Sequence, residues 1–387
     1  MRILRSRGTD RPLSAIPVAV CAPNAFKGTL SARAAAIALG RGVADAGARP
    51  IAVPVADGGD GTLQVLLAAR PGSSASRHRV TGPDGRRVGA RLGRLDPSTY
   101  VVELAEASGL RRLRGVGLDA LHATSRGTGE LIRLALDAGC DRVVVGVGGS
   151  ACTDGGAGLL QALGARLTDS RGREIGPGGA GLESLAAIDL SGLHPRLAGC
   201  SVEVACDIRS PLTGREGAAL MFAAQKGASP SEVLRLDQAL SHFAEVAVAA
   251  GFRGVAELPG AGAAGGCGFG LALLGARLVP GAALVCDLVR LDAAIRGASL
   301  VITGEGRLDT QTRTGKAPAE VGLRARAAGV ACVAVCGTVL DPLTELFASA
   351  IALDGLEPGV DARRHPGALL RRAAARVTAD ALGGSAQ

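Results

Sequence analysis

Apolar positions near the start of the chain follow a strand, helix, strand pattern. Residues 18–22 (VAVCA) form a continuous apolar run, which is typical of a buried strand. Residues 30–47 have apolar side chains at helical spacing, with Ser31 placed to cap the first turn and Gly47 placed to end the helix. A second strand is expected at 51–56. This order predicts a parallel sheet with a right-handed crossover.

The same alternation returns near the carboxyl end. Strands are predicted at 299–306, 330–337 and 351–355, with a helix that begins near Ala317 between the first two. The two ends of the chain therefore supply similar parallel-sheet units.

The middle of the chain has a different character. Residues 78–93 read as a hairpin around a Pro-Asp-Gly turn, and a strand is predicted at 99–105. We therefore predict an α/β protein with two domains. Residues 1–75 and 291–387 would form a Rossmann-like parallel-sheet domain, interrupted by an inserted second α/β domain with a mixed sheet at residues 76–290.

Composition narrows the class of protein. The 387 residues are 47% hydrophobic and include 58 glycines, one tyrosine and no tryptophan, so the cores must be built from Ala, Val and Leu. The nine cysteines form no CxxC pair and most lie in apolar runs, which favours small buried thiols in a reducing cytoplasm. No apolar run is long enough to span a bilayer. The first residues resemble a signal peptide, but Pro17 and Pro23 break the apolar run, so we expect a tail that leads into the first strand.

The formal net charge of +8 raises nucleic acid as a partner, but the arginines are scattered and aromatic residues are few, which argues against it. Only three of the 43 basic residues are lysines: Lys27, Lys226 and Lys316. Each of these lysines therefore needs its own explanation.

Polar segments follow three predicted strands of the parallel sheet. They are 23–31, which contains Lys27; 56–62, which contains Asp57 and Asp60; and 303–316, which contains Glu305, Arg307, Asp309, Gln311 and Lys316. Ligands of open α/β sheets bind at the carboxyl ends of the strands. Phosphoryl transfer needs carboxylates that hold magnesium, cations that neutralise the moving group and amides that contact phosphates. For 56–62, a turn that caps the next helix is an equally good interpretation.

The predicted inserted domain adds further candidates. Ser125 and Thr128 lie at a predicted helix start, where they could bind an anion or act as ordinary caps. Asp207 follows a strand. The stretch 146–156 (GVGGSACTDGG) is a phosphate cradle, the site of a cysteine nucleophile at Cys152, or a tight turn.

Taken together, eight stretches in order resemble the glycerate kinase family of the bacterial two-domain type. They are APNAFKGTLSA, VPVADGGDGT, TSRGTGELI, GVGGSACTDGGAG, CDIRSPLTG, QKGAS, PGAGAAGG and TGEGRLDTQTRTGK. The resemblance runs from about Val18 to about Leu382. It implies an interrupted α/β fold whose active site lies in the cleft between two domains, and it makes 146–156 a backbone cradle with Ser150 and Asp154 facing that cleft. A nucleophilic Cys152 is disfavoured because no histidine lies near it in the sequence.

The resemblance implies ATP-dependent, in-line phosphorylation of D-glycerate to 2-phosphoglycerate, with 3-phosphoglycerate as the alternative product. ATP and Mg²⁺ are the expected cofactors, and the partners are small-molecule substrates, without nucleic acid or membrane, in a monomer or homodimer. Two alternatives stay open: a kinase for a related small hydroxy acid, and a catalytically silent ligand sensor. The expected catalytic residues are Lys27, Asp57, Asp207 and Asp309, the last two also as metal ligands. The expected substrate or phosphate ligands are Asp60, Ser125, Thr128, Ser150, Asp154, Glu305, Arg307, Gln311 and Lys316.

Three positions depart from the pattern of that family. Asn24 and Ala25 stand where an Asp-Ser pair is usual, and Asp60 stands where Glu is usual. The loss of a carboxylate and a hydroxyl beside Lys27 could alter substrate choice or rate, and the shorter side chain of Asp60 has a shorter reach.

Overall fold

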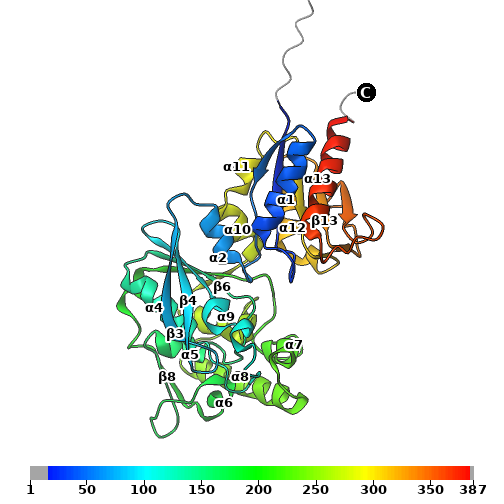
Figure 1. The fold of residues 1–387 in the computed structure, drawn as a ribbon. Coiled ribbons are helices and arrows are strands. Elements are labelled where there is room, and N and C mark those ends of the chain that lie inside the picture. Colours follow the sequence, from blue (N-terminus) through cyan, green and yellow to red (C-terminus); the bar gives the residue numbers. More distant parts are fainter. Residues whose placement is uncertain (1–15, 384–387) are drawn as a thin grey trace, which may run out of the picture.

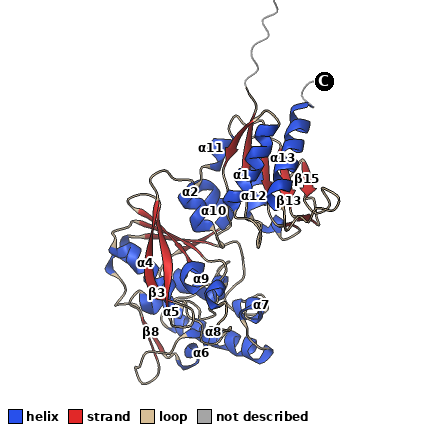
Figure 2. Cartoon of the chain, in the orientation of Figure 1, coloured by secondary structure: helices blue, strands red, loops and turns tan. Residues whose placement is uncertain are grey.

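The computed structural model describes residues 16–383, so the predicted amino-terminal tail lies largely outside the described residues. The chain forms two lobes, each built around one β-sheet (Figure 1). Both ends of the described chain lie in the upper lobe of this view. Helices and strands alternate in both lobes, as Figure 2 shows. No helix within residues 16–383 is both long and apolar enough to cross a membrane.

The first sheet has five parallel strands in the order β15-β13-β11-β1-β2. Helices α1 and α13 cover one face, and α10, α11 and α12 cover the other (Figure 1). The strands are β1 (Val18–Pro23), β2 (Arg49–Ala52), β11 (Leu300–Gly304), β13 (Cys332–Cys336) and β15 (Ser349–Ala352). The helices are α1 (Ala32–Asp45), α10 (Gly281–Leu288), α11 (Leu291–Ile295), α12 (Ala317–Ala327) and α13 (Pro366–Gly383).

The second sheet is mixed, with the order β10-β9-β6-β5-β4-β3. β10, β9, β6 and β5 run parallel, and the hairpin β3-β4 joins them antiparallel. The strands are β3 (Ser74–Thr81), β4 (Arg87–Arg94), β5 (Thr99–Glu103), β6 (Arg142–Gly146), β9 (Ser201–Ala205) and β10 (Arg277–Val279). The prediction of an α/β fold with a parallel sheet and a second, mixed sheet is confirmed.

Further elements pack around these sheets. The helices are α2 (Thr62–Ala68), α3 (Leu104–Ser108), α4 (Arg126–Asp137), α5 (Ala157–Ala162), α6 (Gly178–Gly181), α7 (Ala218–Phe222), α8 (Pro230–Ala249) and α9 (Ala263–Leu273). Two small sheets pair β7 (Arg166–Thr168) with β8 (Ala187–Asp189) and β12 (Arg307–Leu308) with β14 (Thr338–Val339). The 3₁₀ helices are η1 (Leu110–Leu113), η2 (Leu182–Ser184), η3 (Pro195–Gly199), η4 (Ala224–Lys226) and η5 (Thr312–Thr314).

Local sequence signals explain the first unit of the fold. The Ser31 side chain caps α1 by accepting a hydrogen bond from the Ala34 amide at 3.2 Å, and Gly47, with φ +81°, follows its end. The second strand ends at Ala52 rather than at 56, although the Val53 and Val55 amides still donate to carbonyls of β1. Pairing therefore continues irregularly up to the segment that carries Asp57.

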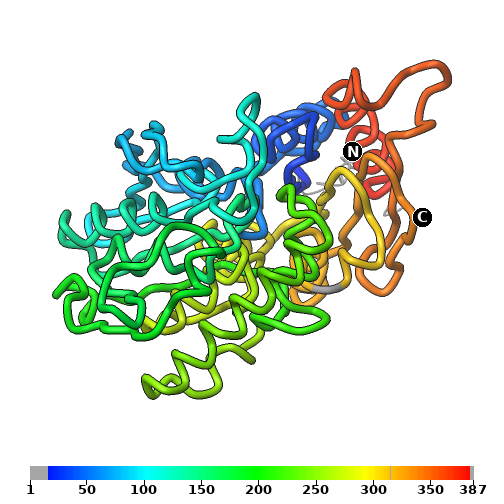
Figure 3. Tube along the Cα trace, turned by 90° about the horizontal axis from the view of Figure 1, so that it is seen from below, coloured from blue at the N-terminus to red at the C-terminus, as the bar shows by residue number. Residues whose placement is uncertain are grey.

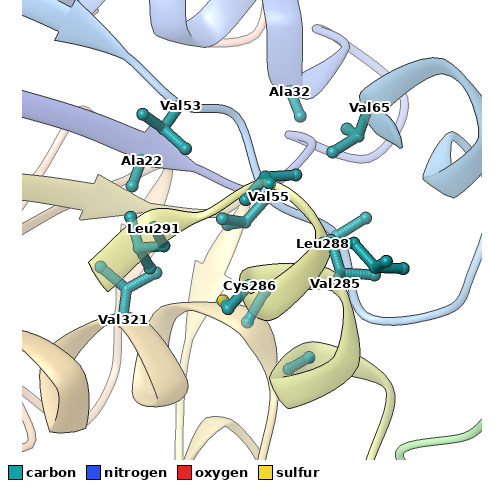
Figure 4. Packing of buried hydrophobic residues seen from close by; sticks show 14 of the residues in the cluster. Ala22, Ala32, Val53, Val55, Val65, Val285, Cys286, Leu288, Leu291 and Val321 are labelled. Carbon is teal, nitrogen blue, oxygen red and sulfur yellow. The ribbon is translucent and has the colours of Figure 1, made fainter. Parts of the chain in front are cut away.

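One hydrophobic cluster joins the two lobes. It contains Val20 and Val301 of the first sheet, and Val101 and Val144 of the second. Between the sheets, α2 and α10 contribute side chains such as Val65, which Figure 4 shows among its neighbours. Figure 3 shows the same two lobes from below, with the chain passing between them. The two sheets are therefore connected by a shared hydrophobic core. The predicted domain boundaries at 75/76 and 290/291 remain a prediction.

Candidate active site

The first sheet has a topological switch point between β1 and β11. From β1 the chain moves to β2 on one side, whereas β11, β13 and β15 follow one another on the other side. In open α/β sheets such a point leaves a crevice at the carboxyl ends of the strands. The two segments that leave β1 and β11 stay in contact, because the Asn24 amide donates to the Gly304 carbonyl at 2.8 Å. A Cβ on Gly306 would lie 3.5 Å from the Lys27 amide nitrogen.

A cavity of about 610 Å³ lies at this switch point. Residues that follow all five parallel strands line it, together with the segment 362–366. Among the predicted site residues, those that line it are Lys27, Asp57, Glu305, Arg307, Asp309, Gln311 and Lys316. Carboxylates and cations from separate parts of the chain therefore meet in one cavity. A volume of this size suits a small organic ligand.

Asp57 lies at the centre of this arrangement. Its Oδ1 accepts the Gly59 amide at 3.2 Å, and its Oδ2 accepts the Asn24 side-chain amide at 3.4 Å. The following turn packs on the second sheet, since Gly58, with φ +87°, lies so close to Ala205 that a Cβ would come within 2.4 Å of the Ala205 carbonyl oxygen. The Asp57 loop is thus clamped between the carboxyl edges of both sheets.

Asp207 approaches Asp57 from the end of β9. Its Oδ1 accepts the amide of Ala282, in the first turn of α10, at 3.1 Å. Its Oδ2 is buried and has no hydrogen-bond partner among the described residues. Burial, and then the negative charge of Asp57, raise the pKa of Asp207 to about 7. Asp57 and Asp207, the latter with an unused buried oxygen, are oxygen donors of the kind that could hold a divalent cation.

The segment after β11 folds over the cavity as a hydrogen-bonded loop. Glu305 is buried, and its Oε1 accepts the Thr312 hydroxyl at 2.7 Å. Burial raises the pKa of Glu305, while its bond from Thr312 and the charge of Lys316 act in the opposite direction. Asp309 pairs with Arg307 (Nε to Oδ2, 3.1 Å), and the Lys316 ammonium donates to Gln311 Oε1 at 3.4 Å.

Asp60 and Ser150 are not on the lining of the cavity. The glycine-rich segment after β6 packs directly on the Asp57 loop, because the Gly148 amide donates to the Gly58 carbonyl at 3.1 Å. A Cβ on Gly149 would lie 2.5 Å from Asp60 Oδ1. These glycines therefore permit close contact between two loops, and Ser150, 7% exposed, pairs with Gly109 in an isolated bridge.

Asp154, Ser125 and Thr128 are placed differently from our expectation. All three are fully buried. Asp154 Oδ2 accepts both the amide and the hydroxyl of Ser125 at 2.8 Å, and the Thr128 hydroxyl donates to Ser108. The Ser125 hydroxyl in turn accepts the Leu159 amide at 2.9 Å. This network ties α4 to α5 and leaves none of the three side chains facing the cavity, so we no longer propose them as ligands.

Comparison with known proteins identifies the family. A sequence profile described as the glycerate kinase family matches residues 19–381. The chain belongs to the glycerate kinase family. It is 46% identical over 327 residues to the glycerate 2-kinase of Escherichia coli K12, covering 83% of this chain and 85% of that protein. It is 44% identical to the glycerate kinase of Bacillus subtilis 168, covering 93% of this chain and 96% of that protein.

A solved structure agrees with this family assignment. A Salmonella typhimurium LT2 crystal structure, assigned as a glycerate kinase 2, superposes with a TM-score of 0.83 at 40% identity, over 96% of this chain and 100% of that chain. The family predicted from the eight sequence stretches is thereby confirmed, and the fold of the glycerate kinase family extends over both lobes.

Sequence reasoning missed the residues that close the far end of the cavity. Thr338, Asp354 and Arg363 line it, and the Thr338 hydroxyl donates to Asp354 Oδ2 at 2.6 Å. Thr338 follows the strand predicted at 330–337, so the sequence offered a signal for it. Asp354 lies within the strand predicted at 351–355, and only the end of β15 at Ala352 places it after a strand.

Lys226 and Cys152 turn out to be internal. The Lys226 ammonium is buried and donates to the Cys152 carbonyl at 2.6 Å, and Cys152 lies beside Cys267 with 3.7 Å between their sulfur atoms. All nine cysteines are free. A buried Cys152 agrees with the expectation that it is not a nucleophile.

Proposed function

We propose that this protein transfers the γ-phosphoryl group of ATP directly to a hydroxyl of D-glycerate. One observation carries the proposal: in a chain of the glycerate kinase family, carboxylates and cations from four strand ends converge at the switch-point cavity. Direct transfer needs positioned charges rather than a covalent intermediate. Lys27, Arg307 and Lys316 would neutralise the phosphates or the glycerate carboxylate.

The residues beside the cavity fit Mg²⁺. Asp207 Oδ2 is buried without a partner among the described residues, and the neighbouring Asp57 opposes its ionisation. Oxygen donors of this kind are what Mg²⁺ prefers. We therefore propose Asp57 and Asp207 as the ligands. Asp309, also predicted as a ligand, is instead paired with Arg307. Bound Mg²⁺ would neutralise charge that develops on the transferring phosphoryl group.

Asp57 is our candidate for orienting the substrate hydroxyl. Its carboxylate is held by Gly59 and Asn24, and it lies on the cavity lining where Asp207 does not. A carboxylate fixed by two donors can accept the hydroxyl proton as the oxygen attacks phosphorus. Closure of the two lobes over bound substrates would exclude water and limit ATP hydrolysis.

The product that we propose is 2-phosphoglycerate. The name of the E. coli relative, glycerate 2-kinase, supports the 2-position. 3-Phosphoglycerate is the alternative product, and mass spectrometry with NMR of one incubation would distinguish the two. We also propose a cytoplasmic enzyme, which free cysteines favour, acting as a monomer or homodimer.

A coupled ADP-release assay with glycerate and MgATP tests the activity. We expect turnover that requires glycerate, is abolished by a chelator and is restored by Mg²⁺. ADP release no faster than without glycerate would overturn the proposal. A panel of small hydroxy acids tests the second candidate, a kinase for a related acid, which the uncommon Asn24 and Ala25 motivate. Thermal stabilisation by glycerate without any product would indicate a ligand sensor.

Two substitutions test the site itself. Lys316→Ala and Asp309→Asn should each lower kcat/KM by about tenfold or more, because each removes a charged group from the cavity lining. The matched control is Arg326→Ala, which removes an exposed cation from the last turn of α12, the helix that follows Lys316. If both cavity variants kept the turnover of the control, this site would be wrong even with the activity present.

A further inference from the structure

Four arginines form a cluster on the lobe of the mixed sheet, outside the cavity. The arginine cluster consists of Arg77 on β3, Arg91 on β4, and Arg111 and Arg112 on η1. None of them lines the switch-point cavity. Arg77 and Arg91 lie directly opposite each other in the antiparallel register, so they share one face of the hairpin. Like charges at such a cross-strand pair repel each other, and a nearby negative charge is needed to offset this repulsion.

The carboxylates within the cluster do not balance its charge. Glu106 accepts from Arg91 at 2.8 Å, from Arg111 at 2.6 Å and from Arg112 at 3.3 Å. Glu103 lies 3.3 Å from Arg111, but its other oxygen accepts the Gly61 and Leu63 amides at the start of α2. Two carboxylates therefore face four guanidinium groups, and an excess of two positive charges remains.

Two of the arginines have unused donors. The side chain of Arg77 makes no hydrogen bond or ion pair with any described residue. Its guanidinium lies over Gly89, where a Cβ would come within 2.6 Å of the Arg77 Nε. The Arg112 Nε is buried and also lacks a partner among the described residues. Burial lowers the pKa of Arg112. Glu106 opposes this shift, and the charges of Arg111, Arg77 and Arg91 add to it.

The cluster is nevertheless open to solvent. The side chains of Arg91, Arg111 and Arg112 are 44%, 32% and 22% exposed, whereas Glu106 beneath them is 5% exposed. The carboxylates thus form the floor of the cluster, and the guanidinium groups form its rim. A small anion can reach the rim without displacing the floor.

We propose that the arginine cluster binds a phosphate dianion, either free phosphate or the phosphate group of a small ester. The planar guanidinium fork matches phosphate oxygens in two-point hydrogen bonds. A phosphate group carries close to two negative charges near neutral pH, which equals the uncompensated charge of the cluster. The site is distinct from the proposed catalytic cavity and does not depend on the reaction proposed for it.

The test is calorimetric titration of Lys316→Ala protein, in which phosphate binding at the catalytic cavity is weakened. Inorganic phosphate and glycerol 3-phosphate are titrated separately at constant ionic strength, with chloride as the blank. We expect one site, and Arg77→Ser should weaken it by at least about tenfold, since a charge-assisted hydrogen bond is lost. The matched control is Arg94→Ser, which removes one exposed arginine from the same hairpin on its other face.

The two titrants distinguish free phosphate from a phosphate ester as the better ligand. With Lys316 intact, Arg77→Ser should leave kcat and KM unchanged, because Arg77 is outside the cavity. The proposal is overturned if neither titrant binds more tightly than chloride. It is equally overturned if Arg77→Ser and Arg94→Ser weaken binding to the same extent, which would indicate general attraction to a basic surface.

Discussion

Asp207→Asn should separate stability from activity in this protein. Asp207 is held by one hydrogen bond from α10, and its second oxygen is buried without a partner among the described residues. The ionised carboxylate therefore destabilises the folded state in the absence of a bound cation. The neutral amide has nearly the same shape and can still accept the Ala282 amide, so it keeps the bond and removes the charge.

The size of the expected stability difference follows from the pKa of Asp207, which is raised from 3.8 to about 7. At 1.36 kcal/mol per pKa unit, this difference corresponds to roughly 4 kcal/mol in favour of the neutral form. Because Asp207 is only partly buried and water screens its charge, we expect about 1–3 kcal/mol to be measurable.

The direction of the Asp207 pKa shift determines the pH range over which the stability of the wild type changes. The folded protein favours the protonated carboxyl, so this stability is fully present below the unfolded pKa of 3.8 and is lost as the pH rises through about 7. The side-chain amide of the variant cannot ionise. The variant should therefore exceed the wild type in free energy of unfolding most above pH 7, with a difference that shrinks towards pH 4.

Urea unfolding without divalent cations, at several pH values between these limits, measures the difference. Added Mg²⁺ should stabilise the wild type but not the variant, and turnover of the variant should fall by about 100-fold or more. Asp380→Asn, an exposed carboxylate on α13, is the control for loss of charge alone. A variant that is less stable than the wild type above pH 7 would refute this account of Asp207.

Three further predictions concern residues that hold the site in place. Gly58→Ala should lower the free energy of unfolding, measured with urea, by about 2 kcal/mol or more and reduce turnover, because its Cβ would meet the Ala205 carbonyl. Gly47→Ala, with open space around the new Cβ, should lower it by only about 1 kcal/mol, and equal losses would contradict the clamp. Asp154→Ala should lower the free energy of unfolding by about 3 kcal/mol in the same assay, since the buried Ser125 amide and hydroxyl lose their acceptor. Full stability with lost turnover would instead indicate that Asp154 is a ligand in the active site. Burial lowers the pKa of Lys226, so the free energy of unfolding of the wild type should increase as the pH rises towards 10.5. The increase should be steeper than that of Lys226→Met, and equal slopes for the two proteins would contradict this prediction.

Local patterns predicted the elements well where one face of an element is buried. The strand at 18–22, the capped helix after Ser31 and the hairpin at 78–93 depend on periodicity and turn residues, which neighbouring residues supply. The strand predicted at 51–56 ends at Ala52, because its later residues pair irregularly with β1. Strand ends were therefore less predictable than strand existence.

The same reasoning gave only part of the site. Lys27, Asp57 and Lys316 were found because each follows a parallel strand, and all three line the cavity. Ser125 was assigned to it from a predicted helix start, and Asp154 from the family resemblance, yet each is the other's buried hydrogen-bond partner. A pattern of polar residues does not tell which of them point inward, since that depends on packing against distant elements.

The sequence by itself determined the α/β class, the two sheet types and the strand ends that carry charge, because periodicity, caps and turns act over a few neighbouring residues. Tertiary structure alone decided which charges meet. Asp57 and Asp207 are 150 positions apart in the chain. The charge of Asp57 affects the pKa of Asp207 only because the Asp57 loop is clamped between the two sheets. Electrostatic interaction depends on distance and burial in space, and neither is encoded in the local order of residues.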